Sequence, residues 1–181
     1  MNGWEDLARY LAGLPEKDRT RFSRYAGLEL SGDEDAAVRT LRIYAAENPS
    51  VTPSGLLATT GAQAGFARES GFARRMGSAG LEFAATDEER QLAHVSLAQT
   101  HFQNRRDVEE LRRFEEHCRA AVDLGHAGTF CYERLAALYE YRGNLEEAIR
   151  ICRRAVEALE AAGDHRSALK LRKRLERLSG E

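Results

Sequence analysis

Apolar residues recur at steps of three and four along most of the chain, which is the pattern of amphipathic helices. The clearest run extends from Leu145 to Leu159 and forms one apolar stripe of about four turns. Shorter runs of the same kind cover residues 108–122 and 131–139, and little of the sequence after Pro53 alternates as a β-strand would. The pattern therefore predicts an all-α protein.

Breaks and start signals divide this pattern into about ten helices. Breaks are expected at residues 15, 31–32, 48–50, 70–71, 86, 104, 125–128, 143 and 163. Capping residues mark four helix starts: Ser31 with Glu34, Thr86 with Glu89, Asn144 with Glu147, and Thr52 before Pro53. The connections are short, so successive helices are expected to pack as antiparallel hairpins.

Residues 55–80 contain six glycines, and the tetrapeptide Gly-Phe-Ala-Arg occurs there twice, at 65–68 and at 71–74. Each glycine inside a helix costs about 0.5–1 kcal/mol of stability relative to alanine. Six glycines in one helical segment therefore need a structural or functional explanation. Close packing between helices is the favoured interpretation. A mobile hinge or a place where a ligand approaches the backbone is the alternative.

The second half of the chain contains an internal repeat. Residues 118–122 match residues 152–156 at four of five positions, with an offset of 34 residues. The preceding helices also match, residues 97–101 with 135–139, although their offset is 38 because the first unit has a longer turn. A helix–turn–helix unit repeated every 34 residues is typical of a solenoid, in which each unit buries its apolar face against the next.

The second unit resembles the tetratricopeptide repeat family. The residues at the family's spacing are Tyr132, Leu135, Ala136, Tyr139, Gly143, Ala148, Cys152 and Ala155. The resemblance covers residues 92–162 and implies antiparallel hairpins stacked into a right-handed superhelix, an α-solenoid. The expected organisation is a single all-α domain over 1–181, with N-terminal helices over 1–85 as candidate degenerate repeats, two repeat-like hairpins over 88–162 and a capping helix over 163–181.

The resemblance also implies a partner-binding groove, lined by the first helix of each hairpin. Carried over position by position, the groove residues are Leu92, Val95, Gln99, Phe102 and Gln103 in the first unit, and Phe130, Glu133, Ala137, Glu140 and Tyr141 in the second. Exposed Leu92, Phe102, Phe130 and Tyr141 would serve as apolar anchors. The alternative is that the N-terminal helices fold over the groove and bury these side chains.

The expected function is therefore a non-catalytic scaffold or adaptor that binds a protein or peptide partner. Self-assembly into a homo-oligomer through the same surface is one alternative. A nucleic-acid-associated regulator is another, although lysine and arginine total 27 against 29 acidic residues, and this net charge of −2 argues against a general polyanion binder. The basic residues that keep this alternative open are Arg105, Arg106, Arg112 and Arg113, and in the last helix Arg166, Lys170, Lys173, Arg174 and Arg177. For the last helix, a solvated face is the simpler interpretation.

Candidate chemistry is sparse, and neither an enzyme nor a cofactor or metal site is predicted. His94 and His101 lie two turns apart on one helix face, about 10.5 Å along the axis, which is too far to share one metal ion directly. His101 takes the place of the repeat tyrosine and is expected to pack there, and Cys118 and Cys152 fall at core positions. Three cysteines without a CxxC motif suit a reducing compartment, and no apolar stretch reaches membrane-spanning length, so a cytoplasmic location away from membranes is expected.

Overall fold

The computed structural model describes residues 3–180, and these residues form ten α-helices and no strand. The prediction of an all-α protein with about ten helices is confirmed. The helices are α1 (Gly3–Ala12), α2 (Glu16–Ala26), α3 (Glu34–Glu47), α4 (Pro53–Phe66), α5 (Ser70–Phe83), α6 (Asp87–Gln103), α7 (Val108–Asp123), α8 (Thr129–Tyr141), α9 (Leu145–Ala161) and α10 (His165–Ser179). Within residues 3–180, no helix combines the length and the apolar composition that a bilayer crossing requires.

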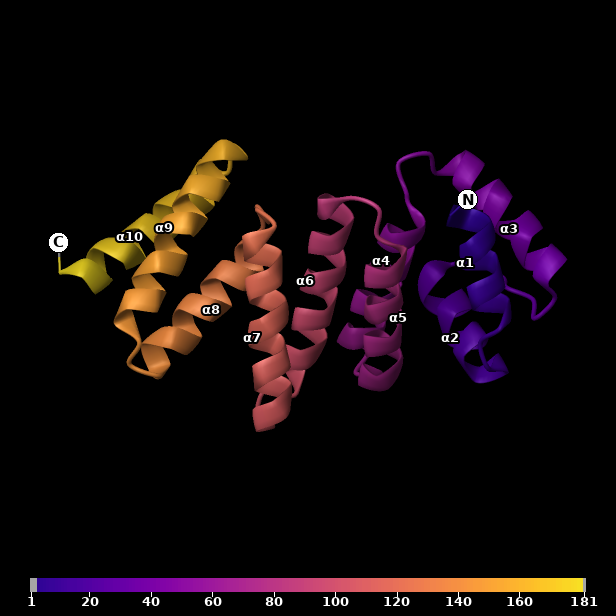
Figure 1. Ribbon diagram of the computed structural model, residues 1–181, viewed down its shortest axis with the longest axis horizontal. Coiled ribbons are helices and arrows are strands. Elements are labelled where there is room, and N and C mark those ends of the chain that lie inside the picture. The colour runs from indigo at the N-terminus through magenta and orange to yellow at the C-terminus, as the bar shows by residue number, and fades with distance from the viewer. Residues whose placement is uncertain (1–2, 181) are drawn as a thin grey trace.

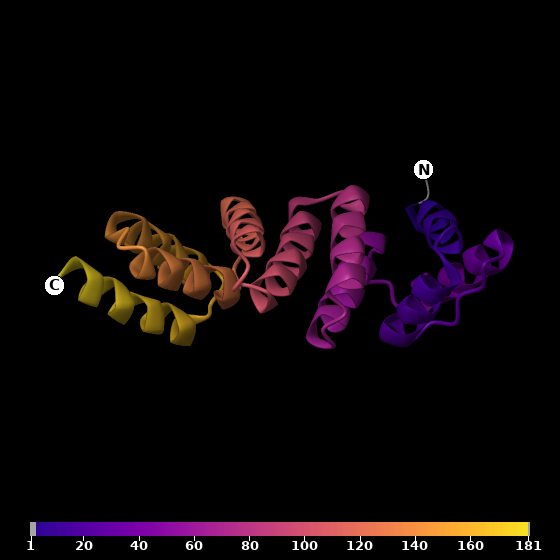
Figure 2. The same cartoon turned by 90° about the horizontal axis from the view of Figure 1, so that it is seen from below.

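The helices are stacked side by side along one long axis (Figures 1 and 2). From α4 onward, consecutive helices pack as antiparallel pairs: α4 with α5, α6 with α7, and α8 with α9, while α10 packs against α9. The turns that close the three hairpins lie along one edge of the stack, the lower edge in Figure 1. This packing is consistent with a helical-repeat solenoid. Its right-handed superhelical path stays a prediction.

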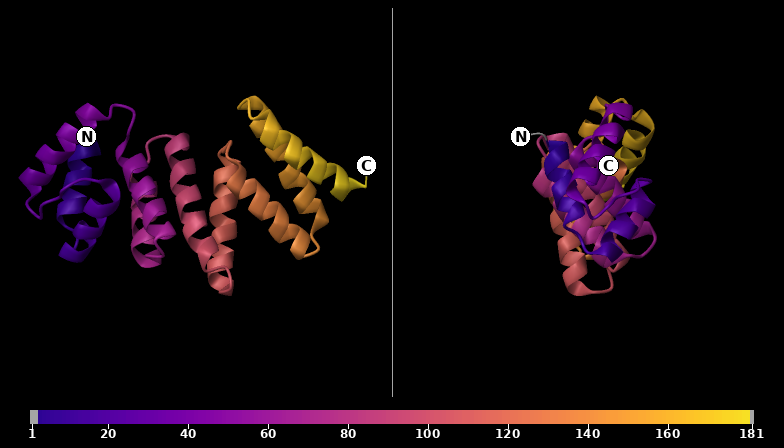
Figure 3. Two further views of the ribbon diagram at one scale, coloured as in Figure 1. Left: turned by 180° about the vertical axis from the view of Figure 1, so that it is seen from behind. Right: turned by 90° about the vertical axis from the view of Figure 1, so that its right-hand side faces the viewer.

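The N-terminal helices depart from the hairpin pattern. Helix α1 packs mainly against α3, and α2 packs against α4, rather than each helix pairing with the next. Helices α1–α3 lie at the opposite end of the stack from α8–α10 (Figures 1 and 3). They therefore do not cover the region where the sequence places the groove.

Helix starts follow local hydrogen-bonding chemistry. Thr86 and Glu89 form the predicted capping box, and the side chains of Asn144 and Thr52 accept a backbone N–H as predicted. The predicted box at Ser31 is wrong: the cap of α3 is Asp33, whose carboxylate accepts the N–H of Ala36 at 2.7 Å. Aspartate two residues nearer the helix satisfies the same orphan amides, so the helix begins later.

Glycine ends helices α7, α8 and α9. After α7, α8 and α9 the chain turns at Gly125, Gly143 and Gly163, each with a positive φ between 73° and 82°. In each case the following residue donates its N–H back to a carbonyl in the last turn. This is the glycine-based helix end that satisfies the last carbonyls without proline.

Two clusters of buried apolar side chains fill the stack. The first draws on α1–α5 and includes Phe22 and Met76, and the second draws on α6–α10 and includes Phe114, Tyr132 and Ile151. Where the clusters meet, α4, α5 and α6 contact one another through small and hydroxyl-bearing residues. The buried hydroxyl of Ser96 on α6, for example, donates to the carbonyl of Ala58 on α4 at 2.8 Å.

Glycines allow these three helices to approach closely. A Cβ on Gly61 of α4 would lie 3.0 Å from the carbonyl oxygen of Ala73 on α5, and one on Gly77 of α5 would lie 2.7 Å from Leu97 Cγ on α6. No real Cβ tolerates the shorter of these contacts without a shift of its neighbours. Close packing, the favoured interpretation of the glycine-rich segment, therefore accounts for Gly61 and Gly77.

The variant Gly61→Ala tests this packing. We expect it to lower the free energy of unfolding by about 1–3 kcal/mol, because the added methyl group presses on the backbone of α5 rather than on a movable side chain. Gly71→Ala is the matched control, since no atom beyond the neighbouring backbone of its own helix lies within 4 Å of its would-be Cβ. We expect its free energy of unfolding to stay the same or to rise by up to about 1 kcal/mol. Urea unfolding measures both, and equal losses would contradict the close-packing account.

Candidate functional site

An apolar groove of about 340 Å³ opens where α6, α7 and α8 meet. The groove lies close to the edge of the stack where the turns of the hairpins are found. Its lining residues come from the end of α6, the first two turns of α7 and the second half of α8. Its lining is mostly apolar and comprises Phe102, Arg105, Leu111, Phe114, Arg134, Ala137, Leu138 and Tyr141.

Three phenylalanine rings pack together at the floor of this groove. Phe102 and Phe114 line the groove, and Phe130 packs against both of them. The rings of Phe102 and Phe114 have centroids 5.0 Å apart, and Phe130 meets both of them edge-on at 6.0 and 6.4 Å. Phe114 is fully buried, whereas Phe102 and Phe130 are partly buried and pack against the same core cluster. Tilted and edge-on aromatic contacts of this kind favour fixed ring positions, so the floor is preformed.

Two arginines lie over the floor. The guanidinium carbons of Arg105 and Arg134 lie 4.6 and 5.0 Å from the ring centroid of Phe102, which is cation–π geometry. Neither arginine forms an ion pair with any residue of the described part of the chain. The groove therefore combines an apolar floor with two uncompensated positive charges.

Tyr141 forms an exposed wall of the groove. Its side chain is 90% exposed at the last residue of α8, the most exposed large apolar side chain among the described residues. Ala137, one turn earlier on α8, is also exposed and leaves the floor open. An aromatic side chain held at the end of a helix beside an open apolar surface is typical of a recognition surface.

The structure brings together three of the ten predicted groove residues, namely Phe102, Ala137 and Tyr141. Gln103 lines a different cleft, beyond the end of α6. Leu92 is 43% exposed and Gln99 is half-buried. Neither lines the groove, because both precede Phe102, the one residue of α6 among its lining residues. Val95 was expected to face a partner, and this is corrected, because Val95 is buried in the core between α6, α7 and α8. Phe130 is partly buried and supports the floor of the groove without lining it.

Glu133 and Glu140 were also predicted to line the groove, but basic residues of α10 form ion pairs with both carboxylates. Lys170 Nζ contacts Glu133 at 2.8 Å, and Arg174 and Arg177 contact the two carboxylate oxygens of Glu140 at 2.5 and 2.9 Å. Three of the five basic residues of the last helix thus form ion pairs with α8. Lys170 and Arg177 nevertheless stay mostly exposed, as a solvated face requires, and only Arg174 is largely covered.

Sequence reasoning missed five groove residues: Arg105, Leu111, Phe114, Arg134 and Leu138. Leu111 and Phe114 belong to the second helix of their hairpin, which the family pattern assigns to the core. One signal was present, because Arg105 follows Phe102 by three residues and a helical turn places such neighbours together. The approach of Arg134 from α8 depends on tertiary packing and leaves no local pattern.

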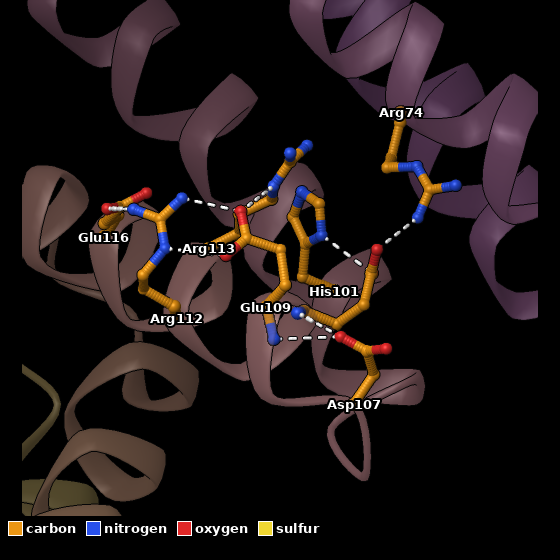
Figure 4. Close-up of polar contacts among 8 residues, drawn as sticks. Arg74, His101, Asp107, Glu109, Arg112, Arg113 and Glu116 are labelled. Carbon is orange, nitrogen blue, oxygen red and sulfur yellow. Dashed lines mark hydrogen bonds and ion pairs between the residues drawn. The ribbon is translucent and has the colours of Figure 1, made fainter.

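Ion pairs neutralise much of the basic surface that the sequence suggested for nucleic acid. Arg112 contacts both Glu109 and Glu116, and Arg113 contacts Glu109 at 3.0 Å (Figure 4). The hydrogen bonds from these two arginines lower the pKa of Glu109 to about 2, so the carboxylate stays charged. Arg112 and Arg113 therefore do not present free positive charge.

Three of the five histidines form a cluster between α6 and α7. His94 Nδ1 and His117 Nδ1 are 3.0 Å apart, and the ring of His117 stacks on His101 with centroids 5.4 Å apart. His101 is buried as predicted and contacts Glu110, and Arg74 and His101 point toward the same carboxylate (Figure 4). No group of three metal-ligating side chains in residues 3–180 has a geometry suited to a metal ion.

The pKa of His117 is lowered to about 4, mainly by burial and to a smaller extent by the neighbouring His94, His101 and Arg113. Burial also lowers the pKa of His94. The two facing rings are therefore neutral at pH 7, so that one ring nitrogen donates to the other. The contact between His94 and His117 therefore joins α6 and α7 without a positive charge on either of these two rings.

The three cysteines are buried and free, and the predicted core positions of Cys118 and Cys152 are confirmed. Burial raises the pKa of the Cys118 and Cys152 thiols, so neither is a reactive thiolate. An apolar groove with two unpaired arginines, rather than a reactive side chain, is thus the feature of this region that is suited to recognition. No protein-family model, curated protein or solved structure matches the chain, so the site is interpreted from its own geometry.

The histidine cluster predicts a pH-dependent stability. The folded-state pKa of His117 is about 4 and that of an unfolded histidine is about 6.5, so between these values the unfolded chain binds more protons. Stability therefore falls as the pH drops from about 6.5 toward 4, and we expect His117 to contribute on the order of 2 kcal/mol to this loss.

The variant His117→Gln removes this titration and keeps a hydrogen-bonding group beside His94. We expect a flatter dependence of the unfolding free energy on pH between 4 and 6.5 than in the parent chain. His165→Gln, at an exposed position on α10, is the control and should keep the parent's slope. Urea unfolding at several pH values measures this, and parallel curves for all three proteins would contradict the prediction.

Proposed function

We propose that this chain is a non-catalytic interaction module that binds a protein or peptide partner in the groove between α6, α7 and α8. The observation that carries the proposal is the open apolar floor around Phe102, with Tyr141 standing free beside it. Apolar surface of this kind costs free energy when it faces water, and burying it against a partner recovers that cost.

The two arginines over Phe102 indicate which side chains a partner would need at this groove. Arg105 and Arg134 form no ion pair within residues 3–180, in a chain where most exposed arginines do. A partner segment with an apolar or aromatic side chain, flanked by carboxylates, would fill the floor and meet both guanidinium groups. Arginine beside an aromatic ring is also a frequent centre of binding energy at interfaces.

The repeat spacing supports the same function independently of the groove geometry. If the resemblance to the tetratricopeptide repeat family reflects common ancestry, the two hairpins α6–α7 and α8–α9 are repeats, and α10 is their cap. Repeat arrays of this kind present extended surfaces to other proteins. The groove proposed here lies between the two repeats, where α6, α7 and α8 each contribute a wall.

A photo-crosslinking amino acid at position 141 tests the proposal. Introduced in place of Tyr141 and irradiated in lysate of the source organism, it should form one discrete covalent adduct, because the side chain stands over the groove. The same amino acid at Ile43, which is 61% exposed on α3 at the far end of the stack, should not give that adduct.

A second variant separates groove binding from chance collision. Ala137→Lys fills the floor from an exposed helix position, so we expect unchanged melting and loss of the adduct at position 141. An adduct that persists in this variant, or appears equally at position 43, would refute the groove as the docking surface. An adduct of twice the chain's own mass would favour the self-assembly alternative.

A further inference from the structure

The repeated tetrapeptide Gly-Phe-Ala-Arg has two different structural roles. In the second copy, Phe72 is buried in the core and Arg74 contacts Glu110 at 2.8 Å. In the first copy, Phe66 is 73% exposed, and Arg68 forms no ion pair with any described residue. The phenylalanine and the arginine of the tetrapeptide are thus packed and paired in one copy, and exposed and unpaired in the other.

The backbone at Arg68 is held in the left-handed region, with φ at +63°. The N–H of Glu69 donates to the carbonyl of Ala64, and that of Arg68 to Gly65, which is the helix end that normally places glycine at this position. The other positive-φ positions within residues 3–180 are all glycines: Gly27, Gly125, Gly143, Gly163 and Gly180. A side chain kept at a strained position where glycine would be relaxed points to a function for that side chain.

Arg68 lies on an open cleft of about 720 Å³ between the α4–α5 turn and the α6–α7 turn. The residues that line it are Phe66, Arg68, Ser70, Gln103, Asn104, Arg105 and Arg106. Asn104 Nδ2 donates to Ser70 Oγ at 3.2 Å and so joins the two turns. The lining carries three guanidinium groups and no carboxylate.

The two carboxylates next to these arginines in the sequence are engaged elsewhere. Glu69 contacts Arg21 at 2.6 Å and accepts a hydrogen bond from Tyr25 at 3.0 Å. Asp107 accepts the backbone N–H groups of Glu109 and Glu110 as the cap of α7. The positive charge of the cleft is therefore not compensated by its nearest acids.

We propose that this cleft binds an oxyanion, either a phosphate monoester or paired carboxylates, on a segment of the peptide partner. Guanidinium groups recognise both with paired, charge-assisted hydrogen bonds, and Phe66 offers apolar surface beside them. Arg105 lines this cleft and the apolar groove alike, so one extended segment can occupy both. The inference rests on the proposed function for the peptide nature of the ligand, whereas the anion chemistry rests on the cleft alone.

A nucleic acid fits the cleft less well. Proteins that follow a phosphate backbone need a row of free basic groups. Away from the cleft, the arginines that would extend such a row, Arg112, Arg113 and Arg174, are already paired with glutamates. Three unpaired arginines converge on this one cleft, which suits a single anionic group. Other unpaired arginines, such as Arg153 and Arg166, are not part of its lining.

The test uses small probes, so its outcome does not depend on the apolar groove. The full chain is titrated with N-acetyl-phosphoserine amide and, separately, with triglutamate, while arginine Nε resonances are followed by NMR. We expect a saturable shift at Arg68, Arg105 and Arg106, and the tighter of the two probes identifies the source of the anion. The double variant Arg68→Gln, Arg106→Gln should weaken that binding by about tenfold or more.

The matched control is Arg153→Gln, Arg166→Gln, which removes two exposed arginines that form no ion pair within the described residues and lie away from the cleft. It should leave the affinity within about twofold, since only general charge changes. No saturable shift with either probe, or equal weakening in both double variants, would overturn the proposal. Tighter binding of a short oligouridylate than of either probe would replace it with a nucleic-acid site.

Arg68→Gly separates a binding role from a structural one. Glycine relaxes the left-handed backbone, so we expect an unchanged or higher melting temperature together with weaker binding of the probe. A lower melting temperature with undiminished binding would show that Arg68 serves the fold and not the anion.

Discussion

The close approach of α4, α5 and α6 is the constraint on which the rest of the arrangement depends. Gly61 and Gly77 leave no room for a Cβ between these helices, and buried hydroxyls such as that of Ser96 replace apolar contacts there. This junction joins the two apolar clusters, of which one belongs to α1–α5 and the other to α6–α10. Without it the N-terminal half and the repeat-like half would share little packing.

The junction also sets the geometry of the edge where both proposed sites lie. Because α4 and α5 pack tightly on α6, the α4–α5 turn with Arg68 is carried to the α6–α7 turn with Arg105 and Arg106. The ion pairs from α10 to Glu133 and Glu140 act at the other side, where they fix α8 and leave Tyr141 free. Free arginines and free aromatic surface thus remain together on one edge, while most other charges are paired.

Periodicity and capping predicted the helices well, because each depends on neighbours within one or two turns. The capping box at Thr86 and the caps at Asn144 and Thr52 follow from local hydrogen bonding, whereas Ser31 failed because Asp33 competes for the same amides. The site was harder to predict. Phe102, Ala137 and Tyr141 followed from the repeat resemblance, but Val95 is in the core and Phe130 supports the floor without lining the groove. The position of Arg134 over Phe102 and the pairing of α10 with Glu133 and Glu140 depend on tertiary packing that no local pattern records.

Hydrogen–deuterium exchange on the free chain and on the chain bound to its native partner tests the central claim most directly, since it locates the docking surface without any substitution. The account predicts slower exchange at the end of α6, the last turn of α8 and the α4–α5 turn, with little change elsewhere. Slower exchange confined to the exposed faces of α7 and α9, or to α1–α3, would contradict it.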